Sequence, residues 1–241
     1  MLVAAAVCPC PPLLVPEVAT GAAPELDAAR AACADAVGLL AAARPDRLYV
    51  VGAAPDGGHG VHPAGSTGSF AGFGVDLSVR LGEAPAGDGD EGARRALPTS
   101  LAVGAWLLGR AGWADAPIEG LGVDGAATPD VCAGLGRGLA DSAGRVALLV
   151  LGDGSACRTV KAPGYLDERA EDFDAAAARA LGTADTAALL ALDTGLAHEL
   201  KAAGRAPWQV LAGAAQGAGL DGRLLFEDAP YGVGYFVAAW S

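Results

Sequence analysis

Residues 152–174 read GDGSACRTVKAPGYLDERAEDFD, and this stretch decides the fold more than any other part of the chain. It follows the apolar run Val146 to Leu151, which predicts a buried β-strand. Gly, Asp and Ser directly after such a strand predict a tight turn, and open α/β sheets bind ligands at the carboxyl ends of their strands. We therefore take Asp153, Ser155 and Cys157 as the candidate catalytic residues.

Each of these three residues also has a plainer interpretation. Asp and Ser stabilise turns by hydrogen bonding to the local backbone, so Asp153 and Ser155 suit a capped turn between a strand and a helix. A helix amino terminus after the strand could lower the pKa of Cys157 and make it a nucleophile. The alternative is a small, buried and inert thiol, because the sequence identifies no base beside Cys157.

Predicted strands and helices alternate along the chain on both sides of the motif. The expected strands are 2–8, 48–52, 74–81, 118–123, 145–151, 224–226 and 233–239, and the expected helices are 24–42, 98–108, 129–139, 166–180, 185–203 and 208–215. This order predicts an α/β fold with a single central mixed, mainly parallel sheet and helices on both faces. We expect one domain over residues 1–241, a long loop at 53–72 and a surface loop at 84–91.

Composition limits the partners. Lys and Arg total 16 against 28 Asp and Glu, which gives a formal net charge of -12 and argues against nucleic acid as a partner. The five cysteines are an odd number without a Cys-x-x-Cys pair, so we expect a reduced, cytoplasmic protein. No stretch reaches the roughly 18 to 20 apolar residues that span a bilayer, and the apolar start is too short for a signal peptide.

The motif resembles the Gly-Asp-Leu-Ser-His-Arg motif of the LigB-like class III extradiol dioxygenase superfamily, which includes the Memo-like proteins. Ala156 and Cys157 stand where that family has its His. Three further stretches are similar to the family: CPCPPLL at 8–14 to its His-Pro-Pro-Leu-Leu turn, FEDAPYGVGY at 226–235 to its Tyr-Glu-x-Pro-Phe-Gly-Val-Gly-Tyr, and, more weakly, GSFAGFG at 68–74. The resemblance implies the LigB-like, phosphorylase-like three-layer architecture.

The resemblance also implies a non-haem Fe(II) site, in which two His and one carboxylate hold the metal and leave positions open for a catechol and dioxygen. By this resemblance Cys10 stands at the first His ligand, the second falls at Ala54 or Pro55, and Glu227 is the candidate carboxylate. A Cys10 thiolate is a softer ligand than imidazole and would favour zinc or copper(I).

Two histidines follow the expected position of the second ligand. His59 and His62 lie in the long loop, which is rich enough in glycine to bring one of them to a metal. A His-x-x-His pair in such a loop also suits two solvated side chains. Metal ligands are therefore expected among Cys10, His59, His62 and Glu227, with a site that holds no metal as the alternative.

Ligand-binding residues are expected near the same strand ends. Lys161 and Arg158 are cations close to the motif and could meet an anionic or phenolate ligand. Tyr231 belongs to a carboxyl-terminal aromatic group that suits the core, an oligomer interface or a pocket for a planar ligand. We expect a small-molecule ligand and, from the family, a homo-oligomer.

Three functional hypotheses follow. The first is a divergent extradiol-dioxygenase-like enzyme with a rebuilt metal site. The second is a catalytically silent relative that keeps the pocket for binding or regulation, which explains the missing histidines most simply. The third is a metal-independent enzyme that uses Cys157, Ser155 or Asp153.

Overall fold

The four central strands are almost entirely apolar, because helices cover both of their faces. A computed structural model describes residues 1–55, 57–84 and 95–241. In it, parallel strands lie side by side in the order β6 (Ile118–Asp124), β2 (Arg47–Ala54), β7 (Val146–Leu151) and β1 (Leu2–Cys8). The predicted buried strand before the motif is β7, at the centre of the sheet.

Antiparallel strands extend this sheet on both sides. β3 (Gly60–His62) pairs with β6, and β9 (Tyr235–Trp240) joins β1 to the edge strand β8 (Gly222–Asp228), which completes seven strands. A separate two-stranded sheet consists of β4 (Thr67–Ser69) and β5 (Ser78–Arg80). The predicted α/β fold with a mixed sheet is confirmed, and the antiparallel strands lie on both sides of the four parallel ones.

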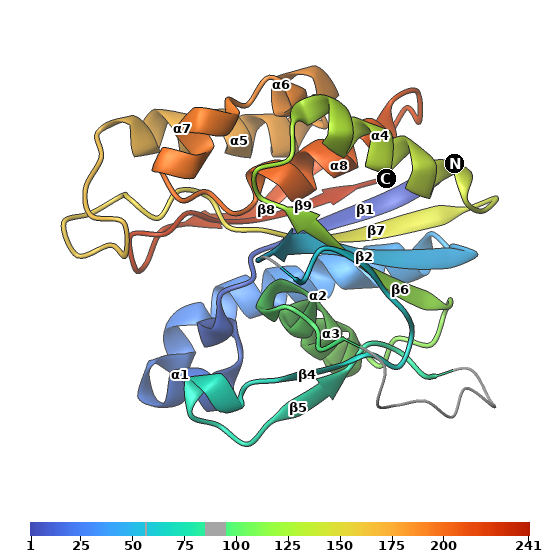
Figure 1. Cartoon of the computed structure of the whole chain (residues 1–241), viewed down its shortest axis with the longest axis horizontal. Helices are drawn as coiled ribbons and strands as arrows, with labels where there is room; N and C mark the ends of the chain where they lie inside the picture. Colours follow the sequence, from blue (N-terminus) through green and yellow to red (C-terminus); the bar gives the residue numbers. More distant parts are fainter. Residues whose placement is uncertain (56, 85–94) are drawn as a thin grey trace.

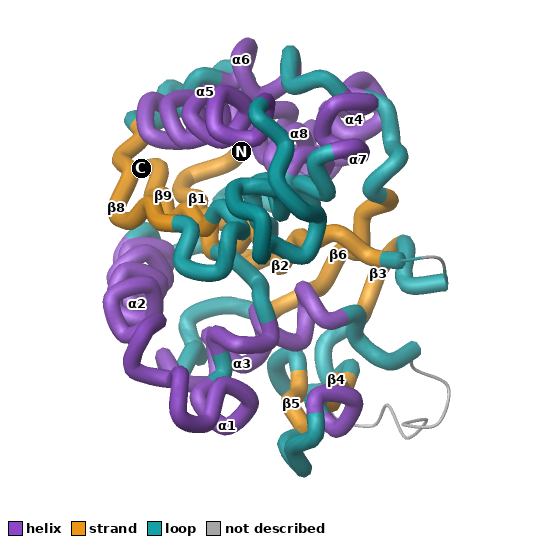
Figure 2. The backbone as a smooth tube through the Cα atoms, turned by 90° about the vertical axis from the view of Figure 1, so that its left-hand side faces the viewer, coloured by secondary structure: helices purple, strands orange, loops and turns teal. Residues whose placement is uncertain are grey.

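Helices form a layer on each face of the seven-stranded sheet (Figures 1 and 2). One layer contains α2 (Asp27–Ala42) and α3 (Thr99–Ala111). The other contains α4 (Pro129–Asp141), α5 (Arg169–Thr183), α6 (Thr186–Leu190), α7 (Thr194–Glu199) and α8 (Arg205–Ala215). Short elements complete the chain: α1 (Pro16–Ala19) and 3-10 turns at Pro12–Leu14, Thr20–Leu26 and Ala71–Phe73. No helix in the described ranges is long and apolar enough to cross a membrane.

Several predicted boundaries were wrong. The loop expected at 53–72 contains β3 and β4, and only Ser78–Arg80 of the strand expected at 74–81 is extended and paired. The helix expected at 185–203 is two helices, because the Asp193 side chain accepts a hydrogen bond from Leu196 N and begins a new one. Most of the surface loop expected at 84–91 lies outside the described residues.

Candidate functional site

The carboxyl ends of the parallel strands meet at one edge of the sheet, at the left of Figure 1 and facing the viewer in Figure 2. Following the register of β1 with β7 and β9 beyond the strand ends places Cys10 between Asp153 and Tyr235. The backbone N–H of Cys10 donates a hydrogen bond to Asp153 Oδ1 over 2.8 Å. These three residues form the candidate site, which we call the edge cluster.

Burial shifts every titratable group of the edge cluster towards its protonated form. Burial raises the pKa of Asp153 to about 7, and the hydrogen bond from Cys10 N only partly offsets this. Burial, and then the negative charge of Asp153, raises the pKa of the Cys10 thiol and of the Tyr235 hydroxyl. At neutral pH Asp153 is therefore the one member of the cluster that can exchange a proton readily, as a general acid or base requires.

Ser155 is committed to a buried hydrogen-bond network. Its side chain is fully buried, its Oγ donates to Asp174 Oδ2 over 2.8 Å, and its backbone N–H donates to Asp174 Oδ1 over 2.7 Å. Arg158 Nη1 adds a third bond to the same carboxylate at 3.2 Å. These contacts favour the structural interpretation of Ser155, a hydroxyl that holds the turn after β7. The predicted catalytic role of Ser155 has no accessible hydroxyl to support it.

Asp174 is the residue that our sequence reasoning missed in this network. It is fully buried in α5, and burial raises its pKa despite the bonds from Ser155 and Arg158. The sequence offers one signal for this role. Asp174 ends the motif at 152–174 and directly follows Phe173, an apolar residue in an otherwise charged start of a helix. An Asp at such a position needs buried hydrogen-bond partners, and the motif turn supplies them.

Two glycines make room for the Asp174 carboxylate. A Cβ on Gly154 would lie 2.7 Å from Asp174 Oδ1, and one on Gly234 would lie 2.6 Å from Oδ2. Backbone bonds run from Gly154 N to Gly234 O, from Gly234 N to Ser155 O, and from Arg158 N to Gly232 O. The turn between β8 and β9 is therefore fastened to the motif loop, and this brings Tyr235 to the edge cluster.

Cys157 is buried and its thiol donates a hydrogen bond to the carbonyl oxygen of Leu200 over 3.5 Å. Burial, followed by the charge of Asp167, raises its pKa, so the thiol remains protonated at neutral pH. This environment is the opposite of the one that activates a nucleophilic cysteine. All five cysteines of the chain are free and buried.

The two loop histidines bond to backbone oxygens. His59 Nε2 lies 2.9 Å from Ala54 O and 4.0 Å from Asp124 Oδ1, so His59 stands at the strand ends of β2 and β6. His62 is buried in β3, with Nε2 2.9 Å from Gly58 O and with Nδ1 lacking a hydrogen-bond partner among the described residues. His62 is therefore a buried residue of the edge strand β3.

Glu227 completes the set of predicted metal ligands, and it lies elsewhere. It is exposed on the edge strand β8 and lines a hollow with residues of α5. Within the described ranges, no group of three or more His, Cys, Asp or Glu could hold a metal ion. With a protonated Cys10 and an exposed Glu227, the donor set does not fit the two-His, one-carboxylate iron site that the resemblance implies.

The predicted ligand-binding residues flank the edge cluster rather than join it. Tyr231 donates its hydroxyl hydrogen to Glu25 Oε2 over 2.9 Å, which links the β8–β9 turn to the segment before α2. Burial and the neighbouring Glu25 raise the pKa of Tyr231. Lys161 is exposed on the motif loop, and Arg158 bonds to Asp174. No cation that the sequence suggested thus reaches Asp153.

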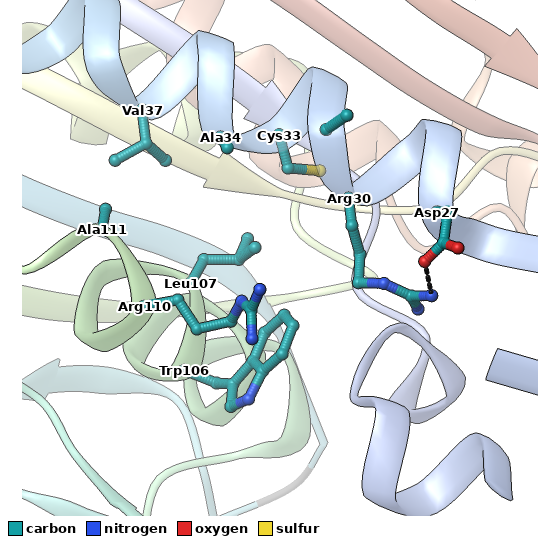
Figure 3. A pocket seen from close by; sticks show the side chains of 10 residues that line it. Asp27, Arg30, Cys33, Ala34, Val37, Trp106, Leu107, Arg110 and Ala111 are labelled. Atoms are coloured by element: carbon teal, nitrogen blue, oxygen red, sulfur yellow. Dashed lines mark hydrogen bonds and ion pairs between the residues drawn. The ribbon is translucent and has the colours of Figure 1, made fainter. Parts of the chain in front are cut away.

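A cavity of about 400 Å³ lies between α2 and α3 (Figure 3). Trp106 forms one wall, with the Arg110 guanidinium 5.1 Å from its ring centre, and Arg30 faces them from α2, held by Asp27. The cavity contains none of the residues that the sequence analysis proposed for the site. We therefore place the candidate site at the edge cluster, where the perturbed carboxyl group is.

Comparisons with known proteins support the fold alone. No protein-family model matches the chain, and no curated protein matches it. A crystal structure of an uncharacterized protein from Escherichia coli K12 is similar, with a TM-score of 0.57 and 16% sequence identity over 99% of both chains. This similarity extends over the whole architecture, from β1 to β9.

Proposed function

We propose that the protein is a metal-independent relative of the LigB-like superfamily that binds a small, hydroxyl-bearing aromatic ligand at the edge cluster. The observation that supports this most is the Asp153 carboxyl, which has a pKa of about 7 and lies beside Cys10 in the edge cluster. It accepts a hydroxyl hydrogen from the ligand when ionised and donates one when protonated.

The chemistry of the cluster selects the class of ligand. Asp153 is the only group in it that ionises near neutral pH, and the thiol of Cys10 and the hydroxyl of Tyr235 stay neutral. A neutral phenol or catechol suits these groups better than an anion, because its hydroxyl groups donate to the carboxylate. The partly exposed ring of Tyr231, next to the cluster, supplies aromatic surface for a planar ligand.

Ring cleavage is not part of this proposal. It requires a metal that binds both the catechol and dioxygen, and the residues at the predicted ligand positions do not form a suitable donor set. The metal-independent alternatives that use Ser155 or Cys157 are also disfavoured, since both groups donate their hydrogens to buried acceptors. Ligand binding with proton exchange at Asp153 is the function that these contacts support best.

Calorimetric titration with catechol, in the presence of a chelator at pH 7.5, tests the proposal. We expect a Kd between about 1 μM and 1 mM for the wild type. Asp153→Asn keeps an oxygen for the Cys10 N–H but cannot ionise, so it should weaken binding at least about tenfold. Asp172→Asn, an exposed carboxylate of α5, is the matched control and should bind as the wild type does.

Two outcomes would contradict the proposal. Equal affinity in Asp153→Asn and the wild type would remove Asp153 from the site. If catechol did not bind in the presence of chelator and bound after anaerobic addition of Fe(II), the result would support the dioxygenase hypothesis instead.

A further inference from the structure

A second cavity lies at the carboxyl end of β6, on the opposite face of the sheet from α2 and α3. It has a volume of about 300 Å³ and is lined by Gly125, Ala197, His198, Lys201, Ala202, Ala203 and Arg205. No Asp or Glu is among these lining residues, although the chain carries a net charge of -12. A wall with three basic side chains and no acid is unusual in so acidic a protein.

Arg205 is a buried cation that forms no direct ion pair among the described residues, and the carboxylates of Asp124 and Asp193 act on it only at longer range. It is the first residue of α8, and only 1% of it is exposed. Its guanidinium donates to the backbone oxygens of Gly125 and Ala127 and to Gln209 Oε1, all of which are neutral. Within the described part of the chain, no carboxylate lies within ion-pair distance of Arg205. A buried charge whose hydrogen bonds all go to neutral acceptors is costly, and an oxyanion in direct contact would offset that cost.

Lys201 reaches the same cavity from an unfavourable backbone position. It follows α7 with a φ of 57°, in the left-handed region where glycine usually ends a helix. The bonds of Lys201 N to His198 O and of Ala202 N to Ala197 O close the end of α7 in the manner of a Schellman motif. A lysine costs more here than a glycine, and Lys201 is one of the residues that line the cavity.

We propose that this cavity binds the oxyanion group of a small molecule, a carboxylate or a phosphate, between Arg205 at its wall and Lys201 and His198 at its rim. Arginine suits this role because its planar fork bonds two oxygens of such a group. The cavity volume matches the lower end of small-molecule sites.

This site is distinct from the edge cluster. Gly204 N donates to the backbone oxygen of Asp153, so the two sites are neighbours, but no residue of the edge cluster lines the cavity. Variants of Lys201 and His198 therefore test this inference without touching Asp153, and Asp153→Asn tests the other site.

The experiment is calorimetric titration with inorganic phosphate and, separately, with succinate, each at constant ionic strength set with sodium chloride. We expect at least one of them to bind the wild type, and the one that binds identifies the chemical source of the oxyanion. Lys201→Gln and His198→Gln alter exposed side chains and should each weaken binding about fivefold. Arg223→Gln, which removes an exposed cation of β8, is the control and should leave the affinity unchanged.

Binding of neither anion to the wild type would overturn the inference. It would also be overturned if Lys201→Gln, His198→Gln and Arg223→Gln all bound the anion with equal affinity. The cavity residues would then contribute no more to binding than a remote surface charge. Urea unfolding of each variant confirms that the fold is retained.

Discussion

Asp153 is stabilised as a neutral acid because burial removes water from it and no cation of the described residues pairs with it. The pKa of Asp153 rises to about 7 in the folded state, from about 3.9 in an unfolded chain. The native state therefore binds the proton more tightly than the unfolded state does. The contribution of Asp153 to stability is therefore fully present below about pH 4 and is lost as the pH rises through 7.

Asp153→Asn removes this loss and leaves an oxygen for the Cys10 N–H. The unfolding free energy of the variant minus that of the wild type should therefore increase by about 2 to 4 kcal/mol from pH 5 to pH 8. Urea unfolding of both proteins at the two pH values measures the gain. A difference between the proteins that does not change with pH would show that Asp153 has an ordinary pKa.

The sequence predicted the position of some site residues and missed the contacts of others. The turn after the apolar run at 146–151 correctly placed Asp153 at a strand end, since strand and turn signals are local. The partner of Ser155 is Asp174, 19 residues further along, and their contact depends on how α5 packs. Tyr235 reaches the edge cluster only through the pairing of β9 with β1, which no local pattern reveals.

At the scale of elements, the β8–β9 turn and the motif loop are held together by close backbone contacts around Asp174. Gly234 makes this contact possible, because the Asp174 carboxylate occupies the space that a Cβ would need. The same packing makes this junction intolerant of added volume.

Gly234→Ala should destabilise the protein by about 1 to 3 kcal/mol, because its Cβ would lie 2.6 Å from the buried Asp174 carboxylate. Gly38→Ala is the matched control, since Gly38 is an exposed residue of α2 with no atom within 4 Å of its added Cβ. It should stabilise the protein by about 0.5 to 1 kcal/mol. Thermal unfolding of the two variants compares them, and a Gly234→Ala protein as stable as the wild type would refute the tight junction.

Elements with long apolar periodicity were predicted well. The strand at Leu2–Cys8 has the predicted bounds, and the strand expected at 118–123 is one residue longer. The segment at 185–203 was mistaken for one helix because its Ala and Leu residues recur at helical spacing, while the capping roles of Asp185 and Asp193 outweigh that pattern.

At the scale of the whole molecule, the seven-stranded sheet separates the residues that the sequence analysis had grouped. Cys10 lies at the end of β1, His62 in the edge strand β3, and Glu227 in the opposite edge strand β8. The alternation of strands and helices predicted the layers, but strand order decides which loop residues meet. The order of this sheet therefore determines that Asp153, Cys10 and Tyr235 lie together in the edge cluster.

The most direct test of a metal-independent site is elemental analysis of iron and zinc in protein purified without chelator or affinity metal, before and after anaerobic loading with Fe(II) and desalting. We predict that the wild type and Cys10→Ser retain no stoichiometric metal at either stage, because the described donors do not converge. Retention of one iron or zinc per chain by the wild type, and its loss in Cys10→Ser, would contradict this prediction and support a rebuilt dioxygenase centre.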